Sequence, residues 1–116
     1  MNRLADRLDG IEGFRGASRS PIRTFEDGDE TPSVGDGIFF ETANLDSTTI
    51  RNFDDGKKGQ QIWVVTRDAH TTFDFTDSNL FGNGGYDYAS SFDDALFGIF
   101  DGSNWYCLLC KSWSPM

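Results

Sequence analysis

The sequence has no long apolar run and few basic residues, and each shortage excludes a class of protein. No stretch approaches the roughly 20 apolar residues that span a bilayer, so we expect no membrane partner. The 10 Lys and Arg residues are outnumbered by 19 Asp and Glu residues, which gives a net charge of −9. A nucleic-acid-binding protein normally needs a basic face, so we expect no nucleic-acid partner. The first residues lack the apolar core of a secretory signal, which favours synthesis in a cytoplasm.

Cysteine and histidine are also scarce, with 2 Cys and 1 His. Cys107 and Cys110 form a C-x-x-C motif inside a strand-like run, where residues three apart point to opposite faces. With no second pair to complete a zinc site, we interpret both as structural. His70 would bind metal only if a threefold axis gathered three copies, and the acidic run at 26–30 (EDGDE) lacks the full spacing of a calcium loop. We therefore predict no metal, no cofactor and no catalytic residue.

The N-terminal segment has a helical pattern. Apolar residues spaced three and four apart fit one stripe of a helix, and such a short helix needs partners in water. The predicted assembly stripe consists of Met1, Leu4, Leu8, Ile11 and Phe14. Gly10 and Gly13 disfavour a longer helix. We assign 1–15 to an amphipathic anchor and 16–36, which is rich in Ser, Pro, Gly and acidic residues, to an extended linker.

Residues 37–116 show short strand-like runs separated by Gly and Asp turns, which predicts an all-β domain, a small β-sandwich or a β-roll. Expected strands cover 38–42, 48–53, 60–67, 71–75, 96–101 and 104–109, and the last two form a hairpin over 101–104. The chain has 11 Phe residues, more than one small core holds, so some should lie between subunits. The predicted core and interface residues are Phe40, Ile50, Phe53, Ile62, Val64, Phe73, Phe75, Phe97, Ile99 and Trp105.

The β region contains one internal echo. Residues 46–53 (DSTTIRNF) resemble residues 68–75 (DAHTTFDF), since in both an Asp precedes Thr-Thr, a large apolar residue and an aromatic residue. The period is about 22 residues. A repeat of this length is compatible with stacked strand units, as in solenoids.

The order of several short segments resembles a β-module that recurs in tail fibre and tailspike proteins of tailed bacteriophages. The segments are 31–34 (TPSV), 40–44 (FETAN), 48–53 (TTIRNF), 59–65 (GQQIWVV), 68–73 (DAHTTF), 79–80 (NL), 83–85 (NGG) and 100–106 (FDGSNWY). The resemblance covers residues 31 to about 109. It implies a non-enzymatic virion protein, made in the cytoplasm of the bacterial host, that assembles as a homotrimer and contacts other virion proteins of the tail or capsid.

Two alternatives to a tail fibre stay open at this point. The first is a trimeric capsid decoration protein, which copy number per particle separates from a fibre. The second is a module that binds a host glycan, because Tyr86 and Tyr88 follow a flexible Asn-Gly-Gly loop and loops on rigid scaffolds carry binding functions. An enzyme is not expected, since the Asp and Glu residues mostly lie beside Gly in turns, where they support backbone geometry.

Overall fold

The computed structural model describes residues 20–112, which form two β-sheets. The large sheet has six strands in the order β2-β3-β5-β9-β10-β7, and the small sheet has three in the order β4-β6-β8. The strands are β2 (Ile22–Thr24), β3 (Phe39–Glu41), β4 (Thr48–Ile50), β5 (Gln61–Val65), β6 (Thr71–Phe73), β7 (Leu80–Phe81), β8 (Tyr88–Ala89), β9 (Ala95–Phe100) and β10 (Trp105–Cys110), with a short 3-10 turn at Asn83–Gly85. The prediction of an all-β domain is confirmed.

The chain alternates between the two sheets, as the coils of a solenoid do. β3 and β5 pair in parallel in the large sheet, while β4 and β6, which follow each of them, pair in parallel in the small sheet. The internal echo lies within these coils, because Thr48 is opposite Thr71 and Ile50 is opposite Phe73. Two similar segments have thus become neighbouring strands with matched side chains.

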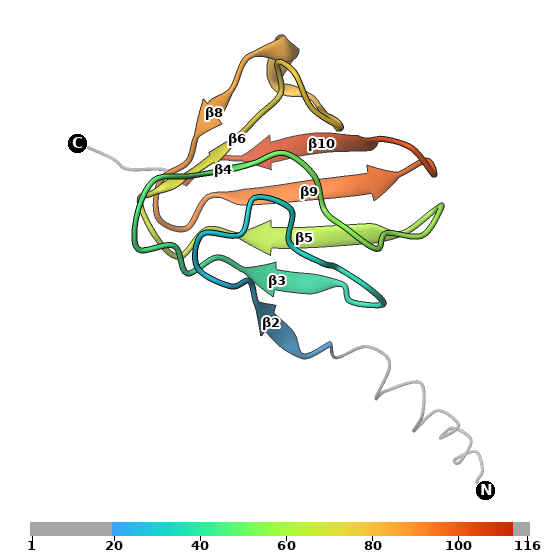
Figure 1. Cartoon of the computed structure of the whole chain (residues 1–116), viewed down its shortest axis with the longest axis horizontal. Helices are drawn as coiled ribbons and strands as arrows, with labels where there is room; N and C mark the ends of the chain where they lie inside the picture. Colours follow the sequence, from blue (N-terminus) through green and yellow to red (C-terminus); the bar gives the residue numbers. More distant parts are fainter. Residues whose placement is uncertain (1–19, 113–116) are drawn as a thin grey trace, which may run out of the picture.

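The C-terminal part closes the large sheet with an antiparallel hairpin. β9 pairs with β5 on one side and with β10 on the other, and Trp105 is opposite Phe100 at the turn. β7 then adds in parallel to β10 at the edge. Figure 1 shows the strands side by side from β2 to β10. The predicted hairpin at 101–104 is confirmed.

The core lies between the two sheets and consists mainly of aromatic side chains. Trp105 is fully buried, stacks on Phe100 with ring centroids 4.7 Å apart, and meets Phe53 edge-on at 5.5 Å. At the other end, Phe25 stacks on Phe40 at 5.1 Å. The buried apolar residues are Phe25, Val34, Phe40, Ile50, Phe53, Ile62, Val64, Phe73, Phe75, Leu80, Leu96, Trp105 and Cys107.

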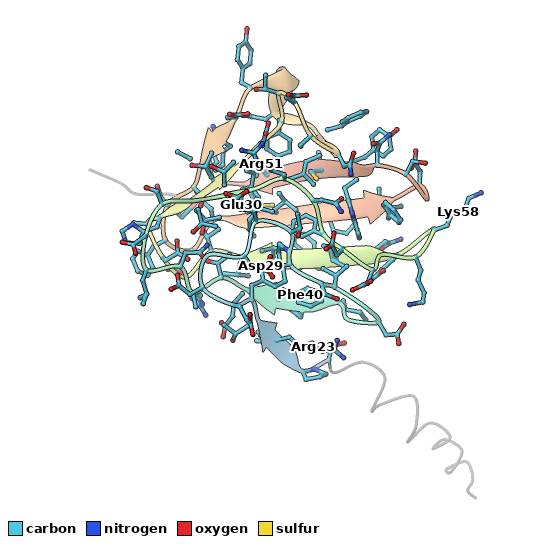
Figure 2. All side chains as sticks on the ribbon, viewed as in Figure 1. Arg23, Asp29, Glu30, Phe40, Arg51 and Lys58 are labelled. Carbon is cyan, nitrogen blue, oxygen red and sulfur yellow. The ribbon has the colours of Figure 1, made fainter. Side chains whose placement is uncertain are left out.

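The predicted domain boundary needs a correction. Residues 20–36 were expected to be an extended linker, but they contain β2 and two core side chains, Phe25 and Val34. The acidic composition hid these positions, because isolated apolar residues between charged ones give no strand period. The carboxylates lie on the loop surface, where Glu30 pairs with Arg51 at 3.3 Å (Figure 2). The predicted anchor at 1–15 lies outside the described residues.

Candidate interaction surface

The outward side of the large sheet carries large apolar side chains in register. Along β5, Ile62 and Val64 point into the core, so Trp63 points outward. The pairing aligns Phe39, Trp63, Phe97 and Leu108 across four strands, and Ile22 extends the row onto β2. A sheet that faces water on one side normally alternates apolar with polar residues. Here that alternation fails along a whole row.

A second row lies beside the first. Ile99 on β9 is opposite Tyr106 on β10, which is opposite Phe81 on β7. The rings pack in pairs, with Trp63 and Phe97 at 4.9 Å and Phe81 and Tyr106 edge-on at 5.5 Å. Leu108 is 68% exposed and Ile22 is 55% exposed. We call this surface the apolar face; it consists of Ile22, Phe39, Trp63, Phe81, Phe97, Ile99, Tyr106 and Leu108.

A cluster of charged groups, Arg67, Glu41 and Asp93, lies at the rim of the apolar face and is ion-paired. Glu41 is the one carboxylate in the outward registers of the large sheet, as far as the described strands go. The Arg67 guanidinium bonds to Asp93 at 2.6 Å and to Glu41 at 3.4 Å. Hydrogen bonds to Asp93 and then to Glu41 raise the pKa of Arg67. The face therefore combines an aromatic centre with a rim at which the charged groups of this cluster are ion-paired.

The outer face of the small sheet is different. Its outward positions in β4 and β6 are Thr49 and Thr72, which lie opposite each other and are half-buried, and Ala89 follows on β8. Thr and Ala present little apolar area. The two outer faces thus differ in chemistry: among residues 20–112, contiguous aromatic side chains face solvent on the large sheet and not on the small one.

Buried aspartates hold the turns that connect the coils. The Asp68 carboxylate accepts hydrogen bonds from the backbone N–H groups of Asn44 and His70 and from the Thr71 hydroxyl, each at 2.8 Å. Burial by itself would raise the pKa of Asp68, but these bonds, together with one from the Thr42 hydroxyl, outweigh it and lower the pKa. Asp68 therefore acts as an ionised acceptor that fixes two neighbouring corners.

Asp94 has a similar structural role in the turn that precedes β9. Its carboxylate accepts hydrogen bonds from the Tyr88 hydroxyl at 2.6 Å, the Ser91 N–H at 2.8 Å and the Ser112 N–H at 2.6 Å. Desolvation opposes ionisation of Asp94, yet the bonds from Ser112, Ser91 and Tyr88 lower its pKa. These acids are engaged as structural acceptors.

The engaged aspartates predict acid sensitivity. A carboxylate whose pKa is lowered in the fold stabilises it above the ordinary value of 3.8 and loses that contribution as the pH falls through the lowered pKa. We expect Asp68→Asn to reduce the free energy of unfolding at pH 7 by about 2 kcal/mol. The side-chain NH2 of the new amide would face a backbone N–H group, of Asn44 or His70, that now donates to the carboxylate. Urea unfolding of Asp68→Asn should also show a weaker dependence on pH below about 4. Asp36→Asn, at an exposed carboxylate paired with Lys57, is the control; equal losses in both variants would contradict the role of Asp68.

The predicted glycan residues, Tyr86 and Tyr88, differ in exposure. Tyr88 is half-buried, and burial followed by its bond to Asp94 raises the pKa of its hydroxyl to about 12. The Lys111 ammonium lies 5.2 Å from the centre of the Tyr88 ring. Tyr86 is 74% exposed and its ring is free to meet a partner. Glycan binding through this pair stays a prediction, with Tyr86 as its accessible member.

A hollow of about 380 Å³ lies at the corner between the coils. Leu45 and Phe92 line it with exposed apolar side chains, and His70 and Arg67 add polar groups. Arg67 is committed to Glu41 and Asp93. The hollow combines apolar walls with few available polar groups.

The His, Cys, Asp and Glu side chains of the described residues are not grouped for metal binding. In the stretch from 20 to 112, no three His, Cys, Asp or Glu side chains are placed to hold a metal ion. In the acidic run, Asp27 accepts a hydrogen bond from the Leu45 N–H at 2.8 Å. Cys107 is buried and Cys110 exposed, on opposite faces of β10 as predicted, and burial raises the pKa of Cys107 to about 12.

Of the predicted core and interface residues, eight are buried and two lie on the apolar face. Phe97 and Ile99 are those two; Ile99 is 38% exposed. The predicted stripe at Met1, Leu4, Leu8, Ile11 and Phe14 lies outside the described residues. Sequence reasoning missed the other members of the face, although residues 61–65 (QIWVV) carried a signal, since Trp63 stands where a half-buried strand should carry a polar residue.

Comparison with known proteins gives no match to any family model, curated protein or solved structure. No helix within residues 20–112 is long and apolar enough to cross a membrane.

Proposed function

We propose that this protein is a non-catalytic structural component of a bacteriophage particle, a homotrimeric tail fibre or tail-associated β-module. The observation that carries the proposal is the coiled arrangement of the strands. The echo segments pair in parallel as β4 and β6, and the segments before them pair as β3 and β5. Such coils suit elongated structural proteins, and they agree with the segment order that resembles phage tail modules.

The state of the carboxylates supports a structural role over turnover. A glycosidase needs two carboxylates flanking a substrate, one of them available to donate a proton. The buried Asp68 and Asp94 instead have lowered pKa values and accept three or more hydrogen bonds each from turns. These hydrogen bonds stabilise the turns.

We assign attachment to the particle to the N-terminal region, whose apolar stripe differs from the acidic surface of the remainder.

The proposal is tested on purified particles and on purified protein. Quantitative mass spectrometry of the particles should detect the chain at a few trimers per particle, as for a fibre. A copy number on the scale of the capsid would favour a decoration protein, and absence of the chain from particles would overturn the virion assignment. Native mass spectrometry of the purified protein should give three times the chain mass of 13.0 kDa.

A further inference from the structure

We infer that the apolar face of the large sheet is the surface on which the subunits meet, so that three copies turn their large sheets toward a common axis. The inference rests on the proposed homotrimer and adds the interface to it. The occupant of the face is a second and third copy of this chain. The argument depends on the size of the face, its composition and the charge of the rest of the molecule.

Size is the first argument. From the usual spacing of strands and rise per residue, the six strands of the large sheet together cover about 400 Å². The apolar face takes up a large part of this area, and contiguous apolar patches of a few hundred Å² on single proteins are often functional. Protruding rings of Trp63 and Tyr106 increase the area that packing removes from water.

Composition is the second argument. Protein interfaces are enriched in aromatic residues at their centre and depleted of charge there, with polar residues at the rim. The apolar face has Trp63 and Phe97 at its centre, on β5 and β9, and its one carboxylate, Glu41, lies at the rim against Arg67. A face without net charge suits an identical face, because apolar rows cover each other without unpaired charges.

The charge of the molecule favours a second copy of the chain over a basic partner as the occupant of the apolar face. Two copies that each carry −9 repel each other across most of their surface, and this repulsion is smallest where charges are absent or paired. The apolar face is such a region, whereas the Thr-lined outer face of the small sheet offers little apolar area to offset repulsion. A basic partner protein would instead be drawn to the acidic loops, such as the run from Glu26 to Glu30.

Arrangement about an axis is compatible with this surface. In a closed ring, one flank of each face meets the opposite flank of the next copy. The first row is apolar over its whole width, from Ile22 on β2 to Leu108 on β10, so both flanks can be buried. Burial of the face also shields Cys110, which lies in the outward register of β10 opposite Ala95.

The test uses two leucines of nearly equal exposure in the full-length protein. Leu108 is 68% exposed on the apolar face, and Leu45 is 72% exposed at the corner hollow. Leu108→Asp places three carboxylates in the interface and should raise the dissociation constant of the trimer by more than about 100-fold. Leu45→Asp, the same change off the face, should leave it unchanged. Leu108→Thr, which keeps strand propensity, controls for local unfolding of β10 and should weaken the trimer less.

The readouts are native mass and sedimentation over a range of concentrations, with circular dichroism to confirm folding. A trimeric wild type, a folded monomeric Leu108→Asp and a trimeric Leu45→Asp support the inference. A wild-type trimer that Leu108→Asp leaves intact overturns the inference but not the proposed trimer. A monomeric wild type overturns the trimer itself. If Cys110 of that monomer is alkylated slowly, and is alkylated faster after deletion of residues 1–14, the N-terminal segment covers the face.

Discussion

Replacement of Trp105 by alanine should remove most of the stability of the domain. Trp105 is fully buried, stacks on Phe100, and donates its indole N–H to the Phe53 carbonyl at 3.2 Å. Deleting a buried Trp side chain costs about 3–5 kcal/mol, and removing the donor leaves a buried carbonyl unpaired. Since whole domains are stable by only about 5–15 kcal/mol, this single change removes most of the stability.

The measurement is urea unfolding followed by circular dichroism, made in the Leu108→Asp background so that subunit association does not contribute. Trp63→Ala is the matched control, because it makes the same substitution at a side chain that is 37% exposed on the apolar face. It should change the free energy of unfolding by about 1 kcal/mol or less. Similar losses at both positions would show that the aromatic core does not lie where the structure places it.

Deletion of residues 1–14 should abolish incorporation into particles while leaving the trimer intact. The deleted segment contains the whole predicted apolar stripe, whereas the described fold begins with β2 at Ile22. Because Phe25 and Val34 belong to the core, a longer deletion into 20–36 would damage the fold and confuse the result.

The experiment compares particles made with wild-type and truncated protein, scored by immunoblot of purified particles. A second variant with Leu4 and Leu8 both changed to Ala keeps the length of the segment and removes two of the five large apolar side chains of the stripe. We expect incorporation to fall in both variants. Unchanged incorporation of the truncated trimer would contradict attachment through the N-terminal region and direct attention to the exposed loops around Tyr86 or Leu45.

The fold could be predicted from the sequence where local patterns sufficed. The run 60–67 and the pair 96–101 and 104–109 carry dense β-branched and aromatic residues with Asp-Gly turns, and they became β5, β9 and β10. The short strands β7 and β8 were missed, since two residues give no period. β2 was missed because its neighbours are charged; its place at the sheet edge is set by parallel pairing with β3, which no local pattern specifies.

The sequence indicated that the protein has an aromatic interaction surface, but not which residues form it. An excess of aromatic residues over the capacity of one core indicated that some lie outside it, but Phe97 and Ile99 were named together with the core residues and were not singled out as exposed. Which face they share depends on register: Trp63, Phe97 and Leu108 become neighbours only when β5, β9 and β10 pair as they do. Sequence reasoning cannot fix such long-range registers, so Leu108 and Ile22 carried no recognisable signal.

The central claim is that the apolar face is covered by other copies of the chain, and Cys110 reports on it most directly. Cys110 is the exposed cysteine of β10. Cys107 should not react with alkylating reagents, because it is buried and its pKa is raised to about 12. Iodoacetamide labelling of the native protein, read by peptide mass spectrometry, should modify Cys110 at least ~10-fold more slowly in the wild type than in monomeric Leu108→Asp. Equal labelling rates at concentrations where the wild type is assembled would contradict the account.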